Sequence, residues 1–197
     1  GNIEELSFLP IDYMGFIFYP ESSRYAGELE PGTLHVIPDD IKKTGVFVNE
    51  EVAPLFNRIE KYDLDVVQLH GNETPEYCED LIETFPETMV IKAFSISQTE
   101  DLVRVKEYEE VCDLFLFDTK TPQYGGSGQK FDWNILDDYQ GEIPFFLSGG
   151  ISIDDIEDIK KIQHPKLYGL DLNSRFETEP GLKNTILLQA FIEKVRQ

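Results

Sequence analysis

Seven short apolar stretches recur along the chain, and polar segments of helical character separate them. Each stretch is nearly continuous in hydrophobicity and rich in residues that favour strands, which is typical of strands buried on both faces of a parallel sheet. The expected strands cover residues 13–19, 44–49, 66–70, 89–95, 114–119, 144–150 and 167–173.

The segments between these stretches predict helices. Thr74 and Pro75 in "TPEYCEDLIETF" suit the N-cap and the first position of a helix. Residues 152–162 place isoleucines at near-helical spacing, and residues 185–196 form an amphipathic stretch with a basic end. Residues 97–110 and the opening "GNIEELSFLP" also indicate helices.

The alternation of strands and helices predicts an α/β fold, with two architectures open. One is a doubly wound sheet, and the other is a closed (β/α)8 barrel. Seven expected strands leave a barrel one strand short. No linker or low-complexity segment divides the chain, so we expect a single domain over residues 1–197.

Composition narrows the range of partners. The net charge of −21 argues against nucleic acid and against anionic membrane surfaces. No apolar run approaches the roughly 20 residues that span a bilayer, and no signal peptide is visible. Two cysteines, Cys78 and Cys112, indicate a reducing cytoplasm, and no Cys/His cluster suggests a metal.

Polar residues gather where the expected strands end. In both architectures, ligands bind at the carboxyl ends of the strands. This group contains an acid, a base and glycines suited to binding phosphate. Its members are Arg24, Asn49, His70, Ser95, Asp118, Ser148, Gly149, Gly150 and the run Asp171–Ser174, in which the apolar Leu172 stands between Asp171 and Asn173.

Asp118 ends its expected strand and is either a local cap or a general acid. The connection after it runs over more than ten residues, whereas such loops usually have about 2–6. Long loops of this kind are often active-site lids, and glycines let them bend. The segment "GGSG" is the expected lid; it comprises Gly125, Gly126, Ser127 and Gly128. It matches neither a P-loop nor a dinucleotide fingerprint.

Several of these residues have an ordinary structural interpretation as well. Gly149 and Gly150 in "SGG" either bind phosphate or form a tight turn. Arg24 either contacts a ligand or forms a surface ion pair, and His70 is either a site residue or a core histidine.

Seven blocks, in order, resemble the phosphoribosylanthranilate isomerase family. They are "DYMGFIFYPESSRY", "TGVFVNE", "VVQLHGNE", "VIKAFS", "LFDTKTPQYGGSGQKFDW", "FFLSGGIS" and "GLDLNSRFETEPGLKN", and they cover essentially the whole chain. The resemblance implies a (β/α)8 barrel without metal or organic cofactor, as a monomer or homodimer. It implies the Amadori rearrangement of N-(5-phosphoribosyl)anthranilate to 1-(2-carboxyphenylamino)-1-deoxyribulose 5-phosphate in tryptophan biosynthesis.

The resemblance also implies roles for individual residues. Asp118 matches the general acid, Arg24 matches the arginine that contacts the anthranilate part, and His70 and Asp171 match residues near the ligand. The phosphate loops are matched by Gly149, Gly150, Asn173 and Ser174. The family commonly has Ser-Gly where this chain has Ser174 and Arg175.

The N-terminus departs from the family pattern. The family begins with a strand ending in a Lys-x-Cys-Gly type block, whose cysteine is the general base, and residues 1–3 align with the helix after it. We therefore expect the first barrel strand and its cysteine to be absent from these 197 residues. Such a form should have little activity, which leaves open a non-catalytic phosphosugar-binding barrel or an inactive fragment. Another phosphate-binding barrel enzyme is a further alternative.

Overall fold

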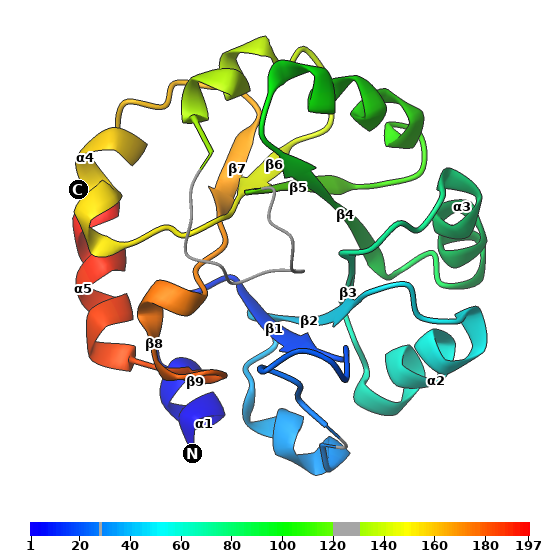
Figure 1. Ribbon diagram of the computed structural model, residues 1–197. Helices are drawn as coiled ribbons and strands as arrows, with labels where there is room; N and C mark the ends of the chain where they lie inside the picture. The colour runs from blue at the N-terminus through cyan, green and yellow to red at the C-terminus, as the bar shows by residue number, and fades with distance from the viewer. Residues whose placement is uncertain (28, 120–130) are drawn as a thin grey trace.

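The chain forms a parallel sheet of seven strands whose spatial order follows the sequence. The computed structural model describes residues 1–27, 29–119 and 131–197. The sheet curves around a centre, with the helices on its outer side (Figure 1). Its strands are β1 (Tyr13–Ile17), β2 (Lys42–Phe47), β3 (Val66–Leu69), β4 (Met89–Ile96), β5 (Leu114–Thr119), β6 (Phe145–Leu147) and β7 (Leu167–Leu170).

All seven predicted strands are confirmed, and their order decides between sheet topologies. The described strands run from β1 to β7 in sequence, each hydrogen-bonded in parallel to the next. A doubly wound sheet instead reverses its strand order at a switch point. The sequential order therefore excludes the doubly wound alternative.

Helices or helical turns occupy the segments predicted to be helical. Thr74 caps its helix as expected, because its hydroxyl accepts a hydrogen bond from the Tyr77 N–H at 3.4 Å. The α-helices are α1 (Asn2–Leu6), α2 (Val52–Tyr62), α3 (Pro75–Thr84), α4 (Ile156–Ile159) and α5 (Thr185–Val195). The 3-10 helices are η1 (Pro31–Val36), η2 (Thr99–Tyr108), η3 (Trp133–Asp138), η4 (Ile153–Asp155) and η5 (Ser174–Phe176).

Two expected helices differ in form from a regular α-helix. Residues 97–110 form the 3-10 helix η2, and residues 152–162 divide into η4 and the short α4. Both segments contain several β-branched residues, which lower helix propensity.

No helix in the described part of the chain is long and apolar enough to cross a membrane.

The interior of the curved sheet changes from apolar to polar along the strands. Its apolar part consists of Val66, Ile91, Ala93, Leu114, Leu116 and Phe146, while the intervening residues pack toward the helices. Since side chains alternate along a strand, the next inward positions are Gln68 on β3, Asp118 on β5 and Ser148 after β6. The polar groups thus lie toward the carboxyl ends.

A small antiparallel hairpin follows η5, and the apolar pattern did not reveal it. It consists of β8 (Glu177–Glu179) and β9 (Leu182–Lys183). Its turn contains Pro180 and Gly181, and Gly181 has a positive φ of 83°. The hairpin is too short for a periodic signal, although Pro-Gly is itself a turn signal.

The two outer strands of the sheet have a large space between them. Among the described strands, β1 pairs with β2 alone and β7 pairs with β6 alone, apart from one isolated bridge between Ile17 and Tyr25. A cavity of about 720 Å³ borders both strands and reaches α5. Tyr13, Leu170 and Phe191 are among its lining residues.

Candidate active site

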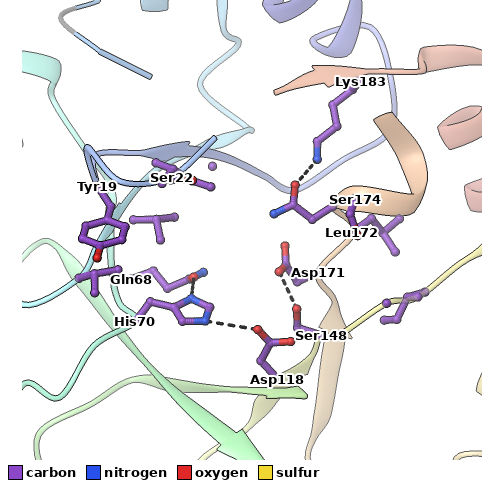
Figure 2. A pocket seen from close by; sticks show the side chains of 18 residues that line it. Tyr19, Ser22, Gln68, His70, Asp118, Ser148, Asp171, Leu172, Ser174 and Lys183 are labelled. Atoms are coloured by element: carbon purple, nitrogen blue, oxygen red, sulfur yellow. Dashed lines mark hydrogen bonds and ion pairs between the residues drawn. The ribbon is translucent and has the colours of Figure 1, made fainter. Parts of the chain in front are cut away.

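A cavity of about 130 Å³ lies at the carboxyl ends of the strands. Figure 2 shows side chains from well-separated parts of the chain converging on it. The predicted strand-end residues that line it are His70, Asp118, Ser148, Gly149, Gly150, Asp171, Leu172, Asn173 and Ser174, whereas Arg24, Asn49 and Ser95 do not line it. Gly125, Gly126, Ser127 and Gly128 lie outside the described residues.

Asp118 and His70 are neighbours in the lining of the cavity. The distance from Asp118 Oδ2 to His70 Nε2 is 3.4 Å (Figure 2). The other carboxylate oxygen, Oδ1, accepts a hydrogen bond from the Thr119 N–H at 2.8 Å. His70 Nδ1 lies 3.0 Å from Oε1 of Gln68. Asp118 thus has a fixed position next to a group that can exchange a proton with it.

Asp171 is the second carboxyl group of the cavity. Ser148 donates a hydrogen bond from its hydroxyl to Asp171 Oδ2 at 2.9 Å. Burial raises the pKa of Asp171, and the nearby Asp118 charge raises it further, against the opposing effects of Ser148 and Lys183. Burial therefore favours the protonated form of Asp171.

Gly149 brings the loop after β6 against the end of β5. Its φ is +97°, and a Cβ built there would lie 3.0 Å from Asp118 Oδ1 and overlap the Thr119 hydroxyl. Gly150 also has a positive φ, 65°. Backbone conformations of this kind favour glycine, so this sequence lets the loop approach the acid closely.

An ion-pair network at the edge of the cavity joins Arg24 to Lys183. Arg24 Nε donates to both carboxylate oxygens of Glu177, at 3.0 and 2.8 Å, and Lys183 Nζ lies 2.9 Å from Oε1. Burial alone would raise the pKa of Glu177, but hydrogen bonds and charges from the two cations outweigh it and lower the pKa. Arg24 itself does not line the cavity, and it is linked to the lining residue Lys183 through Glu177.

Lys183 is a site residue that the sequence analysis missed. Its Nζ donates to Asn173 Oδ1 at 2.6 Å, and it lines the cavity beside Ser174 (Figure 2). Burial lowers its pKa, although Glu177 and Asp171 oppose this effect. The turn signal at Pro180 and Gly181 could have shown that the chain reverses and brings Lys183 back to the cavity.

Lys92 lies on the opposite face of the sheet. Its Nζ donates to the backbone oxygens of Leu69, Gly71 and Ala93, and it lies 3.2 Å from Glu73 Oε2. Lys92 and Glu73 are both buried, and neither lines the cavity. The pair therefore supports the loop after β3 from outside.

The described residues that line the cavity include no cysteine and no cluster suited to a metal ion. In residues 1–27, 29–119 and 131–197, no three His, Cys, Asp or Glu side chains are placed to hold a metal ion. Cys78 and Cys112 are free and buried, and neither lines the cavity. The expectation of no metal and no organic cofactor stays a prediction.

A parallel α/β sheet with acidic, basic and glycine-rich groups at the carboxyl ends of its strands has the architecture of an enzyme that binds a small anionic ligand. The family described as "N-(5'phosphoribosyl)anthranilate (PRA) isomerase" matches residues 2–194. The chain belongs to this family of isomerases.

Individual relatives agree with the family match. The N-(5'-phosphoribosyl)anthranilate isomerase of Parabacteroides distasonis is 44% identical over 196 residues, with 98% of this chain and 88% of the relative covered. The phosphoribosyl anthranilate isomerase of Thermotoga maritima has a solved structure with 33% identity and a TM-score of 0.79. That comparison covers 98% of this chain and 91% of the other. A phosphoribosyl anthranilate isomerase in complex with reduced 1-(o-carboxyphenylamino)-1-deoxyribulose 5-phosphate has 29% identity, a TM-score of 0.76 and the same coverage.

Proposed function

We propose that the protein converts N-(5'-phosphoribosyl)anthranilate to 1-(2-carboxyphenylamino)-1-deoxyribulose 5-phosphate, a step of tryptophan biosynthesis. Membership of the isomerase family supports this function. The observation that carries it in the site is the convergence of Asp118, His70 and the glycine loop after β6 on one cavity. The chemistry needs an acid, and the substrate brings a phosphate that needs a binding loop.

Asp118 acts as the general acid in this proposal. It gives its proton to the ring oxygen of the ribose, the C1–O bond breaks, and the nitrogen lone pair forms a Schiff base at C1. A general base, by resemblance a cysteine on a further strand, then takes the C2 proton, which gives an enolamine that ketonises to the product. His70 next to Asp118 and the buried Asp171 contact the sugar, and burial raises the pKa of the Asp171 carboxyl.

The two ends of the substrate are bound on different sides of Asp118. The phosphate binds the backbone of Gly149 and Gly150 together with Asn173 and Ser174, all of which line the cavity. Lys183 next to Asn173 adds a positive charge there. Arg24 binds the anthranilate carboxylate after exchanging part of its contact with Glu177. Anchoring at both ends contributes chiefly through positioning.

We propose further that the sheet is a (β/α)8 barrel completed by one more strand between β7 and β1. Both strands have an unpaired side in the described residues, and a cavity of about 720 Å³ lies between them. By resemblance, that strand carries the general-base cysteine; Cys78 and Cys112 line neither cavity. Hydrogen exchange in the protein expressed from its full reading frame tests this: slow exchange along the outer side of β1 supports a paired strand, and rapid exchange contradicts it.

Two measurements separate the isomerase from a phosphosugar-binding protein without activity. Calorimetry with reduced 1-(o-carboxyphenylamino)-1-deoxyribulose 5-phosphate measures binding, and loss of the substrate's fluorescence measures turnover. Both should be positive for the protein expressed from its full reading frame. Binding without turnover would favour the non-catalytic alternative, and absence of both would contradict the proposal.

Assembly and location stay predictions. The Thermotoga maritima phosphoribosylanthranilate isomerase is described as dimeric, and we propose a monomer or a homodimer for this chain. Sedimentation of the purified protein would show which form is present. The two free cysteines are consistent with a reducing cytoplasm.

A further inference from the structure

Gln68 is a buried polar residue for which the proposed mechanism has no use. It lies on β3, points into the sheet's interior and lines both the 130 Å³ and the 720 Å³ cavities. On the same face, the apolar Val66 comes two residues before Gln68 and His70 comes two residues after it. A polar amide at this depth costs free energy unless it makes a hydrogen bond.

The partner of Gln68 is the imidazole of His70. Oε1 of Gln68 lies 3.0 Å from His70 Nδ1. With Oε1 of the amide on Nδ1, the proton of this hydrogen bond belongs to Nδ1, because an amide oxygen can only accept. In the neutral ring, the lone pair is then on Nε2, which faces Asp118 Oδ2 at 3.4 Å.

We propose that Gln68 is a positioning residue that keeps the proton of neutral His70 on Nδ1, so that the Nε2 lone pair is presented to the acid Asp118. In the opposite tautomer, Nε2–H would face Asp118 and could only donate to it. With the proton on Nδ1, His70 Nε2 instead accepts from the protonated carboxyl. After Asp118 has released its proton to the substrate, Nε2 can take up a proton from solvent and pass it to the carboxylate, while Nδ1 keeps its own.

In the part of the chain that the structure describes, no group other than Gln68 hydrogen-bonds to Nδ1 of His70. Besides Asp118, the acidic Asp171 is the titratable group whose charge acts on His70 from the β7 side. A carboxyl group near Nε2 does not by itself choose between the two tautomers, because it can accept a hydrogen bond from Nε2–H or donate one to the Nε2 lone pair. Among the described residues, the hydrogen-bond partner of Nδ1 is Gln68. The amide is thus the group that distinguishes the two ring nitrogens.

The first test of this inference is spectroscopic and needs no substrate. The protein is labelled with ¹⁵N-histidine, and His70→Phe assigns the His70 signals among His35, His70 and His164. Spectra are recorded near pH 8.5, about two units above the ordinary histidine pKa. The parent protein should show a protonated Nδ1 on His70. A proton on Nε2 alone would overturn the inference.

Two variants of similar shape provide the matched comparison. Gln68→Met removes the acceptor and should move protons from Nδ1 to Nε2, while Gln68→Glu keeps an acceptor and should retain the Nδ1 proton. An unchanged spectrum in Gln68→Met, or loss of the Nδ1 proton in Gln68→Glu, would contradict the inference. Thermal unfolding of both variants shows whether they fold. If Gln68→Met does not fold, the spectrum of the parent protein still decides the position of the His70 proton.

A kinetic test rests on the proposed function and separates positioning from substrate contact. For N-(5'-phosphoribosyl)anthranilate, Gln68→Met should lower kcat by roughly tenfold or more and leave KM within about twofold of the parent value. A raised KM with unchanged kcat would mean that Gln68 binds substrate directly and would overturn the inference. A parent protein without turnover would contradict the proposed function, while the nitrogen spectra would still decide the role of Gln68.

Discussion

The ion pair between Lys92 and Glu73 gives a sharp prediction for stability. In Lys92→Met, the ammonium that donates to three backbone oxygens and pairs with Glu73 is replaced by an apolar group of similar length. Breaking one partner of a buried ion pair costs about 3–5 kcal/mol, because the other charge is left unpaired. Glu73 keeps hydrogen bonds from the backbone N–H groups of Asn49 and Gly71, so we expect the lower end of that range, about 3 kcal/mol.

Urea unfolding followed by circular dichroism measures this loss in the free energy of unfolding. In a separate thermal unfolding experiment, the midpoint temperature should fall by about 6–12 °C, at roughly 2–4 °C per kcal/mol for a chain of this size. Lys106→Met is the matched control on the exposed side of η2, and it should stay within about 0.5 kcal/mol of the parent. Adding Glu73→Gln to Lys92→Met should recover part of the loss, since neither charge is then left alone. A cost below about 1 kcal/mol for Lys92→Met would refute the reasoning.

Three further variants test the site. Gly149→Ala should cost about 1–3 kcal/mol of unfolding free energy, because its φ of +97° and its contact with Asp118 disfavour a Cβ; an unchanged urea midpoint would contradict this. Asp171→Asn should gain stability relative to the parent as pH rises. The pKa of Asp171 is raised in the folded parent, so the parent protein loses stability from about pH 4 upward, where the unfolded chain gives up this proton more readily than the folded one. Unfolding at a series of pH values measures that difference, and a constant difference would argue against it. Glu177→Gln should destabilise the fold near neutral pH and have no such effect in acid. The pKa of Glu177 is lowered in the folded protein, so its charge stabilises the fold above about pH 4.5, and this stabilisation is lost as the pH falls through the folded pKa. A destabilisation that does not depend on pH would oppose this account.

The strands and the position of Asp118 at a strand end could be predicted because both depend on local pattern. Strands buried on both faces produce continuous apolar runs, so all seven were found. Asp118 and His70 follow such runs directly, and parallel strands bring their carboxyl ends together. The same continuity hides which side of a strand faces inward: Ile91 and Lys92 lie in one run, yet Ile91 enters the interior and Lys92 faces the helices.

Contacts that depend on long-range packing could not be predicted from the chain. Arg24 and Glu177 pair across 153 positions, and no local signal connects them. Lys183 reaches Asn173 only because a hairpin of two short strands reverses the chain. Gln68 lay within the quoted block "VVQLHGNE", but its partner depends on the side-chain direction of His70.

Turnover by the protein and its Asp118→Asn variant tests the central claim most directly. The protein expressed from its full reading frame should convert N-(5'-phosphoribosyl)anthranilate, and Asp118→Asn should lower kcat by about 10²–10⁴-fold. The variant should still bind reduced 1-(o-carboxyphenylamino)-1-deoxyribulose 5-phosphate with nearly the parent affinity, because the side chain keeps its shape. An Asp118→Asn variant with parent-like kcat would contradict the account.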